Sequence, residues 1–317
     1  MRMRFRSALV ILVLVLTMSS FVSAAPTLRI GTQPWLGYGP WWIAQEKGFF
    51  AARGVNVQLI NFIQDQDINA ALASRRLDGA NIATHTAINF IDRGVDIRLV
   101  LLMDASYEAD AIIADASIKS IKDLRNKRVA FEEITTSDLL LTYALRENGM
   151  SKSDIRPVPM PAADAGTALI AGRVDVAVTY EPYLTAALRR SDKHYLLYTA
   201  RSKPGLISDA LAMRSDVLEN NPEAVRAMLL AWQDAMEFMA SNPLEAKEII
   251  ARNVGSSLDE LEPAMAGVKF YDLAENKAAL KGEFRDVVRE VAQVMLSNGW
   301  IKAIPDPDTL LSAGYLP

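Results

Sequence analysis

Residues 28–50 read LRIGTQPWLGYGPWWIAQEKGFF, and the order of apolar, glycine and aromatic residues in this stretch indicates the fold class. Leu28 and Ile30 alternate with polar residues as in a buried strand, and helical spacing of apolar residues resumes from Trp41. Glycine and proline residues break the pattern in between and indicate a loop. A strand that leads through an aromatic loop into a helix is how an open α/β sheet presents a ligand site, at the carboxyl end of its first strand.

The loop between this strand and helix carries three side chains that we predict to contact a ligand, Gln33, Trp35 and Tyr38. Trp35 and Tyr38 have an alternative interpretation as core aromatics, and the sequence leaves it open. Trp41 and Trp42 lie inside the predicted helix, so we expect both in the hydrophobic core.

The first 25 residues have the pattern of a cleavable secretion signal. Arg2, Arg4 and Arg6 form a basic start, residues 8–16 are apolar, and residues 22–24 (VSA) are small enough for a signal peptidase site after residue 24 or 25. The apolar run is about half the roughly 20 residues that a membrane anchor needs. The chain has no Cys, hence no disulfide and no lipid-modified Cys, which fits a freely diffusing periplasmic protein.

Size and charge narrow the class of the remaining chain. Removing the 25 signal residues from 317 leaves about 292, which predicts two domains. Removing three signal arginines from 34 Lys+Arg leaves 31 against 38 Asp+Glu, a net charge near −7. This balance argues against nucleic acid or an anionic membrane surface as partner. No later apolar run reaches transmembrane length, so we expect no membrane insertion of the mature chain, and we expect a monomer.

Short apolar strands alternate with amphipathic helices in two successive series, which predicts two α/β lobes with mostly parallel sheets. The first series has strands at 55–62, 79–83 and 97–103 and helices at 67–74 and 85–92. The second has strands at 111–114, 128–131, 155–158 and 174–179 and helices at 137–147 and 164–171. We predict lobe 1 as residues 26–105 joined by 212–317 and lobe 2 as residues 106–211. From residue 221 onward the pattern is purely helical, and no internal repeat is evident.

The chain lacks most of the residues that enzymes use. His85 and His194 are the only histidines and there is no Cys, so a nucleophilic triad or a zinc site is disfavoured. No glycine-rich nucleotide motif follows a predicted strand. We therefore expect a binding protein rather than an enzyme, with no cofactor and no metal.

Three segments of the chain together resemble a known family. They read GTQPWLGYGPWWIAQEKGFFAARGVNVQL, FEEITTSDLLLTYALRENGM and MPAADAGTALIAGRVDVAVTYEPYL. They resemble the nitrate/sulfonate/taurine family of periplasmic substrate-binding proteins of ABC importers, which includes binders of thiamine-pyrimidine precursors, over roughly residues 28–240. The resemblance implies a type II periplasmic binding protein fold, whose two lobes close over one small molecule and deliver it to a membrane permease.

The start of the helix at 137–147 predicts part of the site in the second lobe. Thr135, Thr136 and Ser137 precede this apolar helix, and hydroxyls with free N–H groups at a helix start bind an anionic or strongly accepting group. We also expect one of the three hydroxyls to cap the helix. In the first lobe, Thr84 and His85 occupy the equivalent position after a strand, and His85 has a capping or surface role as its alternative.

Aromatic and acidic residues complete the predicted site. Tyr180 is expected to face Trp35 from the opposite lobe, so that closure traps the ligand between aromatic walls. Four acids are expected around the cleft, although two of them have capping or bracing alternatives: Glu133, Asp164, Glu181 and Asp209. Acids without a matching Arg or Lys in these loops favour a ligand with an amine, an amidine or ring N–H donors.

The leading functional hypothesis is capture of a small polar organic molecule for import. Taurine-like zwitterions, sulfonates and thiamine-pyrimidine precursors are the candidate ligands. A periplasmic sensor subunit is one alternative, because the sequence does not separate a sensor from an importer subunit. A thiamine-pyrimidine synthase-like enzyme is a remote alternative, because those enzymes are intracellular and use a Cys-rich motif that this chain lacks.

Overall fold

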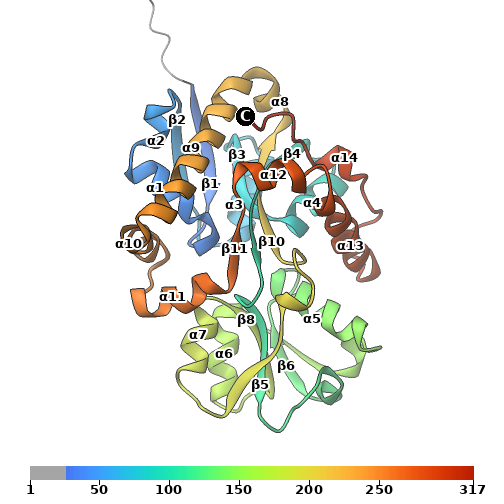
Figure 1. The fold of residues 1–317 in the computed structure, drawn as a ribbon. Helices are drawn as coiled ribbons and strands as arrows, with labels where there is room; N and C mark the ends of the chain where they lie inside the picture. Colours follow the sequence, from blue (N-terminus) through green and yellow to red (C-terminus); the bar gives the residue numbers. More distant parts are fainter. Residues whose placement is uncertain (1–25) are drawn as a thin grey trace, which may run out of the picture.

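The computed structural model describes residues 26–317, so the predicted signal peptide at residues 1–25 lies outside the described part. Two α/β lobes are stacked one above the other, each built around its own sheet (Figure 1). This confirms the predicted two-lobed fold class.

The sheet of lobe 1 has the strand order β11-β4-β10-β3-β1-β2. Its strands come from two separated parts of the chain. They are β1 (Thr27–Thr32), β2 (Asn56–Asn61), β3 (Gly79–Ala83), β4 (Ile97–Ser106), β10 (Ser208–Arg214) and β11 (Val268–Phe270).

The sheet of lobe 2 has the order β7-β6-β8-β5-β9. Its strands are β5 (Asp110–Asp115), β6 (Arg128–Phe131), β7 (Arg156–Pro159), β8 (Val176–Tyr180) and β9 (His194–Thr199). Both predicted lobe boundaries fall within strands, since residues 105 and 106 lie in β4 and residues 211 and 212 in β10. The division at these residues therefore stays a proposal.

Both sheets are mixed and mostly parallel, as predicted. In lobe 1, β1 pairs in parallel with β2 and β3, while β10 runs antiparallel between β3 and β4. In lobe 2, β6 pairs in parallel with β7 and β8, while β5 runs antiparallel between β8 and β9. Because β4 and β10 join the lobes, the carboxyl ends of β1, β3 and β8 all point to the junction. Ligand sites of open α/β sheets lie at these ends.

Two strands were not expected from the sequence pattern. β11 contradicts the prediction of a purely helical chain after residue 221, and it pairs with the end of β4. β9 forms an edge of lobe 2, and all six of its residues are only half-buried. Short or half-buried edge strands have weak alternation, which explains why their pattern was not recognised.

Helices cover both sheets. Lobe 1 contains α1 (Gly39–Glu46), α2 (Phe49–Ala52), α3 (Asp65–Ala73), α4 (Thr84–Asp92), α8 (Ser215–Asn220), α9 (Pro222–Ser241), α10 (Pro243–Val254), α11 (Leu258–Ala266), α12 (Leu273–Ala279), α13 (Glu283–Ser297) and α14 (Pro307–Leu310). Lobe 2 contains α5 (Thr136–Glu147), α6 (Ala162–Ile170) and α7 (Tyr183–Leu188). The 3-10 helices are η1 (Leu36–Tyr38), η2 (Ile121–Leu124), η3 (Lys152–Asp154) and η4 (Ala200–Ser202). None of the helices within residues 26–317 is long and apolar enough to cross a bilayer.

The C-terminal helix α9 packs on α1 through aromatic side chains. Trp232 of α9 packs on Trp41 with ring centroids 4.7 Å apart, and Trp41 also stacks on Phe50. The Trp232 indole N–H donates to the Tyr271 carbonyl at 2.9 Å. Trp41 and Trp42 therefore belong to the core, as predicted.

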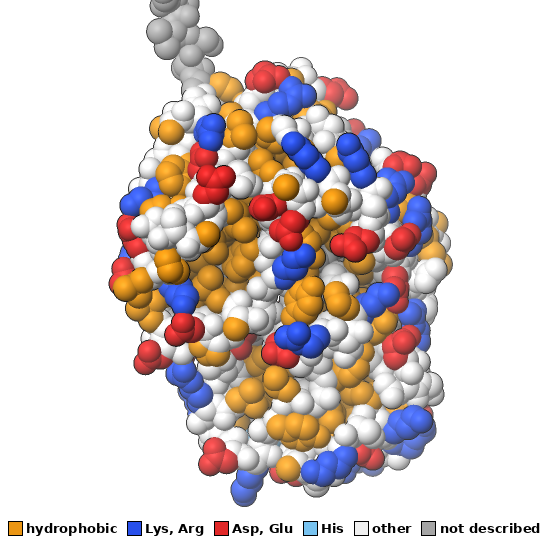
Figure 2. Space-filling model, in the orientation of Figure 1, with side chains coloured by type: hydrophobic (Ala, Val, Ile, Leu, Met, Phe, Trp, Pro, Cys, Tyr) orange, Lys and Arg blue, Asp and Glu red, His pale blue; other side chains and the backbone are white. Residues whose placement is uncertain are grey.

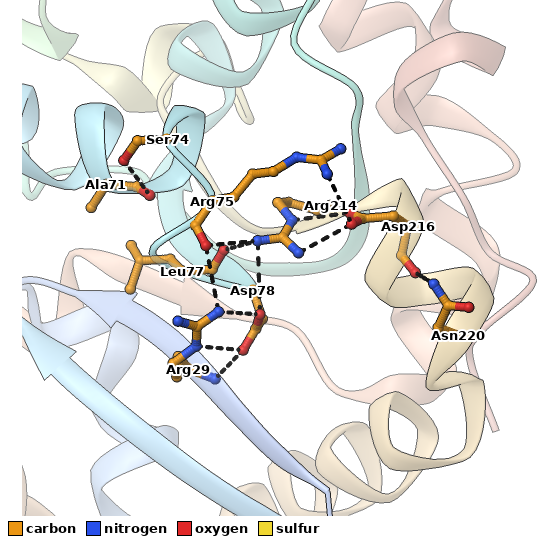
Figure 3. Close-up of polar contacts among 9 residues, drawn as sticks. All are labelled: Arg29, Ala71, Ser74, Arg75, Leu77, Asp78, Arg214, Asp216 and Asn220. Atoms are coloured by element: carbon orange, nitrogen blue, oxygen red, sulfur yellow. Dashed lines mark hydrogen bonds and ion pairs between the residues drawn. The ribbon is translucent and has the colours of Figure 1, made fainter.

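The two lobes contain the same Arg–Asp clamp. In lobe 1, Arg29 at the start of the sheet donates from Nε and Nη2 to Asp78 at 3.0 and 2.8 Å (Figure 3). In lobe 2, Arg128 donates from Nε and Nη2 to Asp175 at 3.2 and 2.8 Å. One clamp joins β1 to the residue just before β3, and the other joins β6 to the residue just before β8. The strand orders β2-β1-β3-β10-β4 and β7-β6-β8-β5-β9 also match, so the two lobes resemble each other in structure although no repeat is evident in the sequence.

We expect Asp78→Asn to lower the free energy of unfolding by about 1–3 kcal/mol at pH 7, because it leaves Arg29 and Arg214 facing a neutral side chain in a partly buried cluster. Burial acts to raise the pKa of Asp78, but the hydrogen bonds and charge of Arg29, together with Arg214, hold it below its usual range. The difference should therefore shrink as the pH falls below about 4. Urea denaturation measures the difference in unfolding free energy between Asp78→Asn and wild type. The control is Glu223→Gln, which breaks an exposed ion pair with Arg226 and should leave the urea midpoint unchanged. Equal midpoints for Asp78→Asn and Glu223→Gln would contradict the stabilising role of the clamp.

The lobes also contact each other outside the connecting strands. On one side, Arg189 of lobe 2 donates to the Asp259 carbonyl at the start of α11 at 2.6 Å. On another, the Lys152 ammonium of lobe 2 lies 5.7 Å from the ring centroid of Trp300 of lobe 1. The structure is thus one in which the lobes are closed on each other.

Candidate functional site

Polar and aromatic side chains from both lobes meet at the junction. Lobe 1 contributes the loop after β1, the start of α4 and the junction ends of β4 and β10. Lobe 2 contributes the start of β5, the start of α5 and the end of β8. These places hold Trp35, Tyr38, Thr84, His85, Asp104, Asp209, Asp110, Thr136, Tyr180 and Glu181.

The aromatic loop after β1 holds two buried carboxyl groups by hydrogen bonds. The Trp35 indole N–H donates to Asp104 Oδ1 at 3.2 Å, and the Tyr38 hydroxyl donates to Asp209 Oδ1 at 2.7 Å. Gly37 lies between the two aromatic residues, and a Cβ at that position would be 2.0 Å from Asp104 Oδ2. The loop therefore passes directly over the acids. Trp35 and Tyr38 therefore reach the buried acids through their polar atoms, and Tyr38 is also a member of the core.

Asp104 and Asp209 are neighbours on adjacent strands. They are register partners in the antiparallel pair of β4 and β10, which places both side chains on one face of the sheet. Asp104 has no exposed surface, and its Oδ2 has no hydrogen-bond partner among the described residues. Burial, followed by the charge of Asp209, raises the pKa of Asp104 well above its usual range, while the hydrogen bond from Trp35 acts in the opposite direction.

A third buried acid, Asp110, faces this pair from lobe 2. Its backbone N–H donates to the Ser106 hydroxyl at 2.9 Å, and its carboxyl accepts hydrogen bonds from the hydroxyls of Ser106 and Thr136. Burial raises the pKa of Asp110 to about 7; the two hydroxyls act to lower it and the charge of Glu181 acts to raise it. Asp110 also contributes to the raised pKa of Asp104, so the two lobes share one acidic cluster. We call Asp104, Asp110 and Asp209 the acid triplet.

Aromatic rings form a contact between the lobes beside the acid triplet. The rings of Trp35 and Tyr180 meet edge to face with centroids 6.3 Å apart, and Tyr180 meets Tyr183 at 5.6 Å. Tyr180 thus faces Trp35 from the opposite lobe, as predicted. The two rings contact each other directly, however, so a flat ligand between them requires them to separate.

The remaining predicted residues of lobe 1 are buried at the same junction. The hydroxyls of Thr84 and Ser208 are hydrogen-bonded at 2.8 Å, which joins α4 to the start of β10. His85 is also buried, and its Nε2 lies 3.5 Å from the Thr86 hydroxyl. Gln33 is half-buried in the loop after β1. All three positions follow the carboxyl ends of β1 and β3.

Comparison with known proteins identifies the family. The family model described as NMT1/THI5 like matches residues 37–246, which is more than half of the chain. The chain belongs to the NMT1/THI5-like family.

Relatives of this NMT1/THI5-like protein cover most of its length. A Brucella abortus chain described as a candidate binding protein is 24% identical over 277 residues, covering 86% of both chains. The taurine-binding periplasmic protein of Escherichia coli is 24% identical over 273 residues, covering 83% of this chain and 84% of its own. The crystal structure of the periplasmic aliphatic sulphonate binding protein SsuA from Escherichia coli has a TM-score of 0.77 at 20% identity, covering 90% of this chain and 97% of its own.

The start of α5 in this NMT1/THI5-like protein differs from the prediction in one respect. None of the hydroxyls of Thr135, Thr136 and Ser137 caps the helix. The Thr135 hydroxyl instead donates to the Glu132 carbonyl at 2.9 Å, and Asp138 in the first turn accepts the N–H of Ile134, which precedes the helix, at 3.1 Å. The expected cap is therefore wrong, because the hydroxyl at the N-cap position bonds to a carbonyl before the helix and not to the free N–H groups of its first turn. Ser137 is buried, and its hydroxyl has no hydrogen-bond partner among the described residues.

The four acids predicted from the sequence separate in the structure. Asp209 belongs to the acid triplet. Glu181 is buried at the junction but braces α7, since it accepts the Thr185 N–H at 3.1 Å and its hydroxyl at 2.7 Å. Burial raises the pKa of Glu181, against these two hydrogen bonds. Glu133 and Asp164 are exposed, and no hydrogen bond or ion pair described for residues 26–317 brings either into the triplet. Asp164 lies in the first turn of α6 and is not its cap, which is Pro161.

Sequence reasoning missed Asp104 and Asp110. Each carried a detectable signal, because a single aspartate ends the apolar run IRLVLLMD and another begins the run DAIIA, on either side of the predicted crossing. An acid at the end of a buried strand is unusual unless it has a partner or a function. Within residues 26–317, no group of three His, Asp or Glu side chains has an arrangement that could hold a metal ion.

Proposed function

We propose that this chain is the periplasmic solute-binding subunit of an ABC importer, and that it captures one small polar organic molecule between its two lobes. The observation that supports the proposal most strongly is the arrangement of side chains at the junction between the lobes. Buried polar groups of lobe 1 and lobe 2 face one another there, beside the Trp35–Tyr180 contact. A polar cluster at the carboxyl ends of two α/β sheets is where such folds hold a ligand.

Several further observations support this proposal. The taurine-binding relative is named as a periplasmic protein, and the amino-terminal residues have the pattern of a secretion signal. The lobes are joined by β4, β10 and the chain segments that follow them, an arrangement that permits hinge closure around a ligand. Lys and Arg alternate with Asp and Glu over the face in Figure 2, so this face has no field of a single sign to attract a polyanion.

The proposal predicts binding of one ligand per chain without chemical change. Purified protein, incubated with an extract of small molecules and then washed, should retain one compound that denaturation releases unaltered. Native mass spectrometry gives the stoichiometry, and chromatography of the released compound shows whether it was altered. Trp35→Phe, which keeps a ring but removes the N–H that Asp104 accepts, should weaken retention by roughly tenfold, the effect of losing one hydrogen bond of about 1.4 kcal/mol. Release of a chemically altered compound would contradict the proposal.

The importer role needs a test of its own. The ligand-loaded protein should stimulate ATP hydrolysis by the cognate permease and ATPase reconstituted in vesicles, because only a closed binding protein engages the transporter productively. Stimulation by a two-component receptor in place of the permease would favour the sensor alternative.

A further inference from the structure

Asp104 and Asp110 of the acid triplet are buried to a degree that calls for a positively charged partner. The exposed fractions of Asp104, Asp110 and Asp209 are 0%, 3% and 7%. They come from three strands, two in lobe 1 and one in lobe 2, so that closing the lobes brings them together. Ionised carboxyl groups are costly to bury unless donors or a cation meet them.

The neighbouring Lys152 and Arg201 are engaged elsewhere. Lys152 of lobe 2 contacts Asp138 at 2.9 Å, and Arg201 near the crossing contacts Glu108 at 2.9 Å. In the part of the chain that the structure describes, no Lys or Arg forms an ion pair with Asp104 or Asp110. Among the described residues, Trp35, Ser106 and Thr136 therefore supply hydrogen-bond donors to Asp104 and Asp110, but Lys and Arg supply no neutralising charge to these two carboxyl groups.

The hydrogen bond that Asp104 receives leaves it acceptor capacity. A carboxylate offers about four lone-pair positions. Asp104 accepts one hydrogen bond from Trp35, and its Oδ2 is fully buried without a partner. This oxygen lies under the loop at Gly37 and shares the junction with Asp209 and Asp110. A ligand with several N–H donors is complementary to such a surface, whereas a sulfonate or nitrate would meet three acids.

We propose that the ligand is a small organic cation with several N–H donors, of the ammonium, amidinium or guanidinium class, and that Asp104 and Asp209 of lobe 1 and Asp110 of lobe 2 bind it. This inference rests on the proposed solute-binding function. The rings of Trp35 and Tyr180 lie beside the acids and favour a cation over their faces. Closure of the lobes is then stabilised by the ligand, because it neutralises acids that otherwise repel each other across the junction.

Isothermal titration with four probes tests the charge of the ligand. The cationic probes are guanidinium and methylammonium at millimolar concentration, and the anionic probes are methanesulfonate and nitrate, each with sodium or chloride as counter-ion. We expect one cation to bind per chain and neither anion to bind. Asp104→Asn and Asp110→Asn, which keep the side-chain shape, should each weaken cation binding at least 30-fold. The matched control Asp192→Asn removes an exposed acid of lobe 2 and should leave the affinity within twofold.

A second measurement separates ligand contact from a merely structural role. Around the bound cation, Asp104 faces Asp209, Asp110, the Trp35 indole and Tyr271, and Asp110 faces Ser106, Thr136 and Glu181. Cation binding at pH 6 should release a proton from this cluster, which appears as a dependence of the binding enthalpy on the ionisation enthalpy of the buffer. Asp110→Asn should reduce that proton release.

The outcomes distinguish this inference from the proposed function. Binding of an anion alone, with an affinity that Asp104→Asn leaves unchanged or improves, overturns the cation proposal and leaves solute binding standing. Failure of both cations to bind also overturns it, whatever the anions do. The proposed function itself is contradicted if the protein retains no small molecule from the extract, or if it releases the retained compound chemically altered.

Discussion

Asp110→Asn is expected to make the ligand-free protein more stable at pH 8, by up to about 4 kcal/mol. Burial raises the pKa of Asp110 to about 7, from 3.8 for an ordinary aspartate. A shift of about three units corresponds to roughly 4 kcal/mol, at about 1.4 kcal/mol per unit. The folded protein therefore favours the protonated carboxyl, and ionising it at high pH costs stability. Asparagine is neutral at every pH and can still accept the hydrogen bonds of Ser106 and Thr136.

The sign of this effect gives it a distinctive pH profile. For an acid whose pKa is raised by folding, the native state binds more protons than the unfolded chain between the two pKa values. Wild-type stability should thus fall as the pH rises from about 4 through about 7, and Asp110→Asn should flatten this fall. Near pH 4 the two proteins should have similar melting temperatures.

Thermal unfolding at a series of pH values, without ligand, measures the profile. Asp192→Asn is the control, since it removes a charge of the same sign from an exposed position of lobe 2. A lower melting temperature for Asp110→Asn than for wild type at pH 8 would mean that folding stabilises the ionised carboxylate. That result would contradict a pKa of Asp110 raised by burial. Asp110→Asn keeps the shape of the side chain and removes only its ionisable group. If this variant is more stable than wild type, we infer that Asp110 is retained for ligand binding and not for stability.

Gly37→Ala is expected to lower the free energy of unfolding by about 2–3 kcal/mol and to abolish ligand retention. The added Cβ would lie 2.0 Å from Asp104 Oδ2 and 2.5 Å from Trp35 Nε1. Neither atom can move away cheaply, because Asp104 has no exposed surface and its other oxygen accepts the Trp35 hydrogen bond. The loop must therefore lift from the acids, which removes the donor that orients Asp104.

A double-mutant cycle gives this prediction its control. In Gly37→Ala/Asp104→Ala the closest overlap is gone, so the double variant should lose less stability than the sum of the two single changes. Gly314→Ala, at an exposed glycine where a Cβ meets nothing nearer than 3.9 Å, should behave as wild type in urea denaturation. Additive effects of Gly37→Ala and Asp104→Ala would show that the loop does not depend on its contact with the acid.

Some of this protein follows from the sequence alone. The alternation of apolar strands with amphipathic helices predicts two α/β lobes, because burial on one face repeats every two residues in a strand and every 3.6 in a helix. The stretch at residues 28–50 places a strand, an aromatic loop and a helix where the structure has β1, η1 and α1. Trp35 and Tyr180 were predicted to face each other from opposite lobes, and they do.

Other features depend on which parts of the chain meet in space. Asp104 and Asp110 are six residues apart, yet they lie in different sheets and share a cluster with Asp209 because β10 returns beside β4. No hydroxyl caps the start of α5, because the Thr135 hydroxyl donates to the Glu132 carbonyl, and Asp138 accepts the N–H of Ile134 before the helix. Neither the acid cluster nor the hydrogen bonds at the start of α5 produce a periodic pattern in the sequence from which they could be predicted.

The sequence alone does not predict which acidic residues lie at the junction. Composition and loop position indicated an acidic site, but Glu133 and Asp164 point to solvent while Asp104 and Asp110 are buried. A carboxylate is equally compatible with a helix start, an exposed loop or a cleft until its neighbours are known. The sequence by itself therefore determined the lobes, the aromatic loop and the acidic character of the site. Only the tertiary structure decided which acids come together, because burial and mutual repulsion are properties of the packed junction and not of any single strand.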